Sequence, residues 1–297
     1  MNRAVTILTG EPTVSLVAEM QLRHAGVVEM AEWVRTHRPE CLPDDFDTQV
    51  NEYAKAMRLF PHGGQREGGM VTHNELLVEL AGRKCYDSFG FKAGRKSNAE
   101  YIVNTQQGDV PHASIMYHAK MSFFIGGVSR RVSHELIRNY VGADRDEEGS
   151  PSQESTRYTH HYGFYVAHPY ILQLAQETTR SEAFVVDELD VFRGAMQRNY
   201  DEYLGYIERQ VAEFKKTMGA EPKGIDRKRI YESASPYLSH ACETSWVWTS
   251  NPIALAKMFR ERDNDGADLE FRRLAKKWKR LCRERWPALF CQPWMQE

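Results

Sequence analysis

Residues 150–158 constrain the fold of this chain more than any other segment, because they read Ser-Pro-Ser-Gln-Glu-Ser-Thr-Arg-Tyr. Hydroxyl, amide, carboxylate and guanidinium groups fill the first eight positions, where Pro151 is the one apolar residue. Such a segment cannot be a core strand, since buried polar groups without partners are costly. Its hydroxyl, guanidinium and backbone N–H groups together favour the binding of an anion. A solvated linker has the same composition, so both interpretations stay open at this point.

The segment just before it predicts a helix with two distinct faces. Four apolar residues recur at steps of three and four, as along one face of a helix: Ile125, Val128, Val132 and Leu136. Three nitrogen-bearing side chains recur at steps of four and share a second face: Arg130, His134 and Arg138. A row of basic groups therefore precedes the hydroxyl-rich segment.

Composition narrows the class of protein. The 297 residues are 41% hydrophobic and 27% charged, which is typical of a soluble globular chain and allows a single catalytic domain over 1–297. The formal net charge of −2 argues against bulk nucleic-acid binding. Five scattered cysteines without a Cys-x-x-Cys pair favour a reducing cytoplasm and no metal or disulfide framework. We expect no signal peptide and no membrane span, since no apolar run approaches the roughly 18 residues required.

Alternating patterns and turn residues predict the other elements. Strands are expected at 4–8 and 13–19, paired as a hairpin, and at 164–167 and 246–249. Helices are expected at 24–42, from Asn74 to Lys84, from Asn98 to about Thr105, at 182–218 and from Pro252 onward. Residues 60–69 read as a glycine-rich linker, because no Gly-Lys-Ser/Thr follows.

The hydroxyl-rich segment belongs to a series of motifs that resembles the flavin-dependent thymidylate synthases. The signature of that family is Arg-His-Arg, seven residues and Ser, within a wider Ser-x-x-x-x-Ser-x-Arg-Tyr frame. Arg138 fits the first arginine of the signature. Four residues fit the wider frame: Ser150, Ser155, Arg157 and Tyr158. Upstream, residues 112–119 (His-Ala-Ser-Ile-Met-Tyr-His-Ala) resemble the family's His-x-Ser-Val-Leu-Glu-His-Ala. Downstream, residues 262–275 resemble its arginine-bearing C-terminal helix.

The resemblance implies a fold and an assembly. The fold is α+β, an antiparallel β-sheet flanked by long α-helices. Family members are homotetramers in which each active site draws residues from several subunits. Relative to the family, residues 24–73 look like a helical insertion and residues 141–149 like a loop insertion.

The resemblance also implies a reaction, the C5-methylation of a uracil nucleotide. dUMP would become dTMP, or UMP would become 5-methyl-UMP. Methylenetetrahydrofolate is the carbon donor in the family, NADPH the reductant and FAD the cofactor. The protein's own share is then positioning and electrostatics.

Residue roles follow from the same resemblance. Arg262 would be catalytic, facing the uracil ring and stabilising the charge that develops on it. The expected substrate-binding residues are Arg130, Glu135, Arg138, Gln153, Ser155, Arg157 and Arg262. The expected cofactor-binding residues are His112, Ser114, Arg138, Asn139, Tyr140, Gln153 and Asn251. From the residues alone, Arg262 could equally be a surface arginine paired with Glu261 or Asp265.

Three departures from the family leave the substrate open. Arg-His-Arg reads Arg138-Asn139-Tyr140, so a fixed positive charge is lost. We expect either Arg145 or a nucleotide-induced ordering of the loop at 141–149 to replace it. Fourteen residues separate Tyr140 from Ser155, where the signature has seven. The phosphate-side arginine that many members carry before a Leu-Pro has no clear match near Pro236. A divergent relative, the UMP/dUMP methylase type of polyoxin-like antibiotic pathways, fits these changes as well.

Two other classes of function stay open on sequence. A metal-dependent hydrolase could use five histidines, namely His112, His118, His134, His160 and His161. No HExxH spacing occurs among them. A nucleic-acid-binding protein could use the basic helix from Arg272 to Arg285, whose basic side chains would otherwise form a solvated outer face. Neither alternative predicts the visible absorption of a bound flavin.

Overall fold

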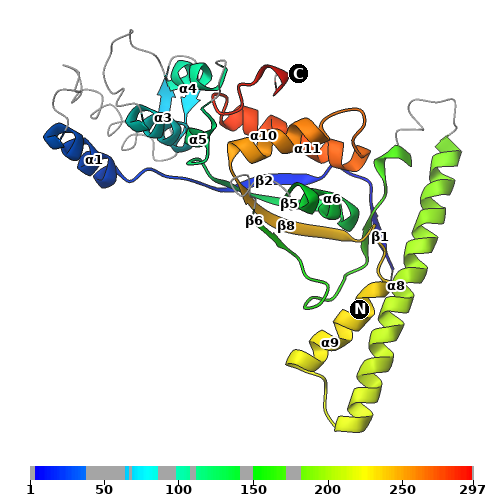
Figure 1. Ribbon diagram of the computed structural model, residues 1–297. Coiled ribbons are helices and arrows are strands. Elements are labelled where there is room, and N and C mark those ends of the chain that lie inside the picture. The colour runs from blue at the N-terminus through cyan, green and yellow to red at the C-terminus, as the bar shows by residue number, and fades with distance from the viewer. Residues whose placement is uncertain are drawn as a thin grey trace.

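A four-stranded antiparallel sheet forms the centre of the protein (Figure 1). The computed structural model describes residues 4–37, 64–66, 69–85, 98–107, 112–140, 150–171 and 182–295. The strands lie in the order β2 (Thr13–Glu19), β5 (Met121–Ser129), β8 (Glu243–Ser250) and β6 (Ser150–Gln153). The predicted α+β class with an antiparallel sheet is confirmed.

One face of the sheet packs on three helices in the main core, which also includes Val78, Ile102, Ile115 and Met116. The helices are α6 (Arg130–Tyr140), α10 (Pro252–Arg262) and α11 (Leu269–Arg285). Side chains alternate along β5, so Phe123 and Ile125 point inward and are fully buried. Phe123 meets the ring of Trp278 on α11 edge-on, with centroids 5.1 Å apart. Burial of each large apolar side chain stabilises the fold by about 1.5–3 kcal/mol.

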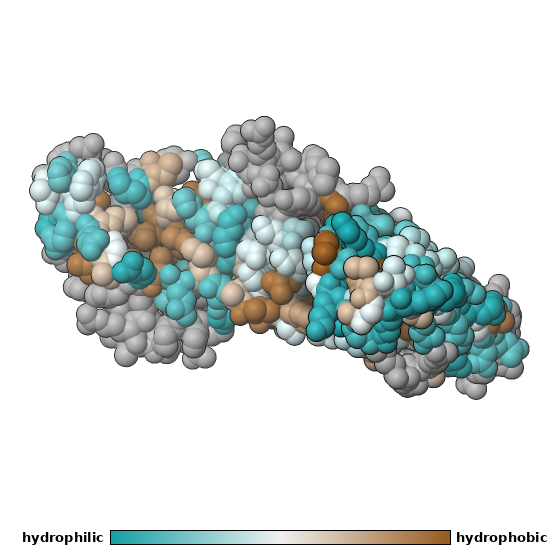
Figure 2. Space-filling model, turned by 90° about the horizontal axis from the view of Figure 1, so that it is seen from below, coloured by the Kyte–Doolittle hydropathy of each residue, from teal (hydrophilic) through white to brown (hydrophobic). Residues whose placement is uncertain are grey.

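The opposite face of the sheet carries exposed apolar side chains. Phe124 on β5 lies directly opposite Val247 on β8, and both side chains are exposed. Figure 2, which views the molecule from below, shows hydrophobic residues gathered toward the middle and one side. The other end of the molecule in this view is mostly hydrophilic. Phe124 and Val247 are therefore available to a partner.

A small lobe lies at one end of the sheet (Figure 1). It contains α1 (His24–His37), β3 (Gly64–Arg66), β4 (Gly69–Val71), α3 (His73–Cys85), α4 (Asn98–Gln107) and α5 (Ala113–Met116). Val27 and Val34 of α1 pack with Leu76 of α3 in a separate apolar cluster. Thr72 and Glu75 form a capping box, since each side chain accepts the other residue's backbone N–H, at 3.3 and 2.8 Å.

A helical arm stands at the other end of the sheet (Figure 1). It consists of α8 (Glu182–Met218), α9 (Gly224–Ala234) and the 3-10 turn η3 (Ser235–Tyr237). The predicted bounds of α8 are confirmed, and at 1.5 Å per residue it is about 55 Å long. Tyr200 and Tyr203 of α8 pack on Tyr165 and Cys242, which joins the arm to the sheet. A last 3-10 turn, η4 (Pro293–Met295), lies near the end of the chain.

The predicted N-terminal hairpin is wrong. β1 (Thr6–Leu8) pairs in parallel with β7 (Phe164–Val166), while β2 pairs with β5. Alternation predicts that a segment is a strand, but it says nothing about the partner strand.

Two predicted helix positions belong instead to a strand. Ile125 and Val128 lie on β5, and α6 begins only at Arg130. The register shifts between Ile125 and Val128, where Gly127 has a φ of 71°. This bulge places two buried strand residues three positions apart, which imitates a helical period.

Two smaller predictions are also wrong. Asn74 lies inside α3 and bonds the backbone of Lys120, so Thr72 rather than Asn74 caps that helix. Within the predicted linker, residues 64–66 pair with 69–71 as β3 and β4. No helix in the described parts of the chain is long and apolar enough to cross a membrane.

Candidate active site

Helix α6 follows β5 without a loop, which fixes its first turn against the sheet. The backbone N–H of Arg130 donates to the carbonyl of Cys242 at 2.9 Å, and that of Arg131 donates to His240 at 3.1 Å. The start of α6 is thus bonded to the segment that enters β8. Side chains along α6 therefore have defined positions relative to β6, β8 and α10.

Arg262 and Glu135, both predicted from sequence, meet between α10 and α6. Arg262 Nη1 lies 3.3 Å from Glu135 Oε2, and the two side chains are 20% and 25% exposed. The guanidinium also lies over the ring of Phe271, 5.1 Å from its centroid. Asp265, one of the partners expected from sequence, pairs instead with Arg272 at 2.6 Å. Arg262 is therefore oriented by a carboxylate and an aromatic face while it stays partly accessible.

Gln153 is fixed at the edge of the sheet beneath α6. Its amide nitrogen donates to Ser133 Oγ at 2.9 Å and to Thr244 Oγ1 at 3.0 Å. These two bonds leave the side-chain carbonyl oxygen as the group that can accept from a ligand. Ser133 was missed by the sequence analysis, although it lies one residue from His134 in the motif.

The hydroxyl-rich segment forms a tight turn after β6. The carbonyl of Ser155 accepts from Thr159 N–H at 3.0 Å, and its hydroxyl accepts from Arg157 N–H at 3.3 Å. Arg157 is exposed, and its Nε lies 3.0 Å from Glu232 Oε1 on α9. Arg130 donates from Nη2 to the carbonyl of Glu154 at 2.8 Å. Its Nε is buried and has no hydrogen-bond partner among the described residues.

The predicted cofactor residues lie in different parts of the fold. His112 and Ser114 are exposed at the start of α5, which packs on α10. Asn251 is fully buried and caps α10, because its Oδ1 accepts from Ala254 N–H at 3.0 Å. The side chains of Arg138, Asn139 and Tyr140, in the last turn of α6, lie outside the described residues, as does Arg145.

The sequence analysis missed a charged network behind the site. Asp268 caps α11 by accepting from the N–H groups of Glu270 and Phe271, at 3.0 and 3.1 Å. Arg131 at the start of α6 pairs with both Asp268 and Glu270. Glu270 in turn accepts from the backbone and hydroxyl of Ser129, at 2.7 and 2.8 Å. The network holds the first turns of α6 and α11 together, and so it positions Phe271 beneath Arg262.

The environment of Asp268 predicts that the protein becomes less stable at low pH. Burial raises the pKa of its carboxyl, but hydrogen bonds from His168 and Arg131 outweigh burial and hold the pKa well below its usual range. The ionised Asp268 carboxylate therefore stabilises the fold fully above the pKa of an unfolded aspartate, about 3.9. This stabilisation is lost as the pH falls below that value. Asp268→Asn keeps a capping side chain, so it should lower the free energy of unfolding by about 1–3 kcal/mol near neutral pH.

Urea unfolding at two pH values checks this prediction. The gap between wild type and Asp268→Asn should shrink near pH 3, because wild-type Asp268 loses its charge advantage there. A gap of equal size at both pH values would contradict a role for the ionised carboxylate.

Comparisons with known proteins identify the family of the chain. Residues 70–288 match the family model described as thymidylate synthase complementing protein. The chain belongs to the flavin-dependent thymidylate synthase family. A flavin-dependent thymidylate synthase of Corynebacterium aurimucosum is 31% identical over 222 residues, covering 74% of this chain and 80% of that protein. One of Mycobacterium tuberculosis is 33% identical over 217 residues, covering 72% and 77%.

A solved structure has the same fold. It is a UMP/dUMP methylase, PolB, from Streptomyces cacaoi, bound with 5-Br UMP. The TM-score is 0.50 at 16% identity, and the match covers 96% of this chain and 94% of that one. This member of the flavin-dependent thymidylate synthase family is thus an enzyme, and the cofactor of its family is FAD.

Two adjacent histidines of this family member, His160 and His161, pack against aromatic side chains. Burial, with Arg130 nearby, lowers the pKa of His161 to about 4. The ring of His160 lies edge-on to Tyr203 and Tyr231. No group of three or more His, Cys, Asp or Glu among the described residues could hold a metal ion. The family, rather than that absence, decides against the hydrolase alternative.

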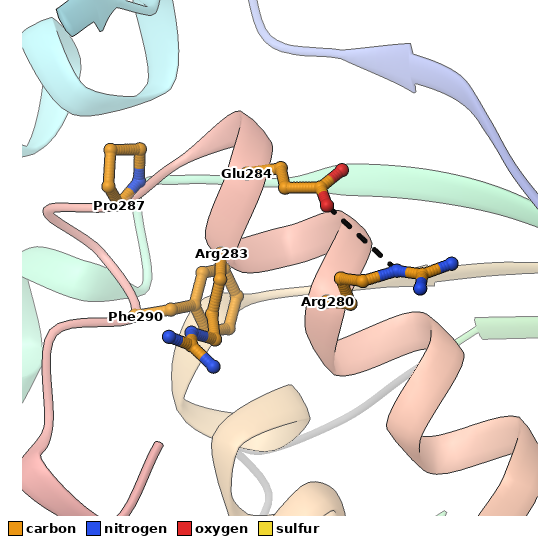
Figure 3. A pocket seen from close by; sticks show the side chains of 5 residues that line it. All are labelled: Arg280, Arg283, Glu284, Pro287 and Phe290. Carbon is orange, nitrogen blue, oxygen red and sulfur yellow. Dashed lines mark ion pairs between the residues drawn. The ribbon is translucent and has the colours of Figure 1, made fainter. Parts of the chain in front are cut away.

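Four of the eight basic side chains of the C-terminal helix pair with carboxylates from other segments. Ion pairs join Arg272 to Asp265, Arg273 to Glu11, Lys279 to Asp263 and Arg285 to Glu19. A hollow of about 340 Å³ lies at the end of α11 (Figure 3), lined by Arg280, Arg283, Glu284, Pro287 and Phe290. Arg283 is twelve residues, or about 18 Å, from Phe271 along the helix. The hollow is therefore separate from the Arg262 site.

Proposed function

We propose that this protein methylates C5 of the uracil ring in dUMP, in UMP or in both. Methylenetetrahydrofolate is the carbon donor in this proposal, and NADPH is the reductant. FAD, when bound, supplies the hydride that completes the methyl group. The observation that carries the proposal is the position of Arg262, held between the carboxylate of Glu135 and the ring of Phe271.

Arg262 and Glu135 together complement the edge of a uracil ring. The guanidinium donates hydrogen bonds to ring carbonyl oxygens, and the carboxylate accepts from an N–H or a sugar hydroxyl. As C5 becomes nucleophilic, negative charge spreads onto the ring carbonyl groups. A cation that is already oriented stabilises that charge without reorganising.

Ser155, Arg157 and Arg130 bind the nucleotide phosphate in this proposal. Ser155 and Arg157 lie on one tight turn, and a guanidinium can bind a phosphate through two parallel hydrogen bonds. The buried Nε of Arg130, which lacks a hydrogen-bond partner among the described residues, is a further donor for an anion.

The described residues fit a flavin. Exposed Ser114 and His112 present a hydroxyl and an imidazole to solvent beside α10. Gln153 presents a carbonyl oxygen that can accept from a ring N–H. We assign FAD binding to His112, Ser114, Gln153 and Asn251, with Arg138, Asn139 and Tyr140 at the end of α6.

We also propose a cytoplasmic homotetramer that shares its active sites. The backbone of Arg130 bonds to Cys242, just before β8, whereas Asn251 follows the end of that strand. At about 3.3 Å per residue, the eight steps from Glu243 to Asn251 span about 26 Å. A second copy of the chain would bring its flavin-binding residues close to the phosphate-binding residues of the first copy. The exposed face around Phe124 and Val247 offers that copy an apolar surface.

A methylation assay tests the proposed function. Purified protein with FAD, NADPH and methylenetetrahydrofolate is incubated with dUMP and UMP in parallel, and the nucleotides are analysed by mass spectrometry. At least one nucleotide should gain a methyl group at C5. Oxidation of NADPH without methylation of either nucleotide would show that the flavin works, and it would contradict the proposal that a uracil nucleotide is the substrate.

A further inference from the structure

The guanidinium assigned to the substrate phosphate is already paired within the protein. Arg157 Nε lies 3.0 Å from Glu232 Oε1, and the two side chains are 50% and 44% exposed. Glu232 lies in the last turn of α9, where its neighbours Tyr231 and Ala234 are buried. The backbone of Glu232 is therefore anchored, while its side chain can turn toward solvent.

Positive and negative side chains are mixed around the segment assigned to the phosphate. The other cations there are Lys228, whose Nζ lies 5.1 Å from the ring centroid of Tyr158, and Arg227, whose charge helps to lower the pKa of His160. Three carboxylates adjoin the same segment: Glu154, Glu232 and Glu243. His160 and His161 add no charge near neutral pH, because burial lowers the pKa of both. A dianionic phosphate must therefore compete with a carboxylate for its main donor.

We propose that Glu232 is a specificity-determining residue, which competes with the 5′-phosphate of the nucleotide for Arg157. Binding of the phosphate displaces the Glu232 carboxylate into solvent, and the displaced charge remains close enough to repel the dianion. The phosphate then contributes less to affinity than Arg157 alone would allow. Nucleotide and nucleoside are therefore discriminated weakly. This inference rests on the proposed function, because it takes a uracil nucleotide as the ligand.

Exchange of Glu232 for glutamine tests the proposal. Glu232→Gln keeps the size of an exposed side chain and removes its charge. The FAD-loaded variant should bind dUMP about 3- to 10-fold more tightly than wild type, as for loss of a competing partly exposed ion pair and its repulsion. Deoxyuridine, which has no phosphate, should bind both proteins equally. Titration calorimetry at low ionic strength gives all four constants, and added salt should reduce the gain.

A matched variant on the same helix controls for net charge. Asp226→Asn makes the same change in charge, but Asp226 lies 3.9 Å from Arg229 rather than beside Arg157. It should leave dUMP affinity within about 2-fold of wild type. In a background of Arg157→Ala, the gain from Glu232→Gln should disappear, since the two changes act on one interaction.

The possible results separate this proposal from the function on which it rests. Equal dUMP affinities in wild type and Glu232→Gln, with deoxyuridine still bound, overturn the competition and leave the methylase assignment standing. An equal gain from Asp226→Asn also overturns it, because the effect is then general electrostatics. Absence of dUMP and deoxyuridine binding in every FAD-loaded variant contradicts the proposed function, and the competition with it.

Discussion

Arg262→Ala is expected to reduce turnover of the uracil nucleotide by about 10²- to 10³-fold, as for loss of one preorganised donor. The guanidinium is held in place by Glu135 and Phe271 before substrate arrives, so its interaction with the charged ring needs no reorganisation. FAD should remain bound, because the residues assigned to the flavin lie elsewhere. Steady-state turnover, with flavin content measured by absorption, checks both statements.

Arg260→Ala is the matched control for this variant. Arg260 lies on the same helix and is exposed, two residues before Arg262. Its removal should leave turnover within about 2-fold of wild type, as for most surface changes. Near-normal turnover of Arg262→Ala would move the activation of the ring to another group.

Phe271→Ala is expected to lower the free energy of unfolding by about 3–5 kcal/mol, as for loss of a fully buried aromatic ring. The side chain of Phe271 is 0% exposed and belongs to the main core. It also supports the guanidinium of Arg262, so stability and turnover should fall together. Urea unfolding monitored by tryptophan fluorescence measures the loss of stability.

Phe271→Leu separates the two roles of this residue. Leucine retains much of the buried volume, so its cost in stability should be clearly smaller than that of alanine. Leucine has no aromatic face, so the cation–π contact with Arg262, worth about 0.5–2 kcal/mol, is lost. Turnover should therefore fall even where the variant is well folded. Unchanged turnover in Phe271→Leu would show that Phe271 acts only as a core residue.

Sequence predicted best what depends on local chemistry. The bounds of α8 follow from its charged helical composition and from Gly219, which has a φ of 68° after the last turn. Asn251 before Pro252 gives a start signal for α10, and the structure has the helix there. Such signals involve neighbouring residues, so no tertiary information is needed to read them.

Pairings across long stretches of sequence could not be predicted in the same way. Glu135 and Arg262 are separated by 127 positions, and Arg131 and Asp268 by 137. Only the family frame placed Glu135 and Arg262 in one site, and nothing signalled their direct contact. The competing partner of Arg157 was hidden for the same reason, because Glu232 belongs to a helix 75 residues further along the chain.

Release of hydrogen from C5 of the uracil ring tests the account most directly. Methylation at C5 replaces that hydrogen, so dUMP or UMP labelled with tritium at C5 must lose its label to water. Wild-type protein with FAD, NADPH and methylenetetrahydrofolate should release tritium in step with methylated product, and Arg262→Ala should release it about 10²-fold or more slowly. Consumption of NADPH by the wild type without tritium release from either nucleotide would contradict a uracil C5-methylating site.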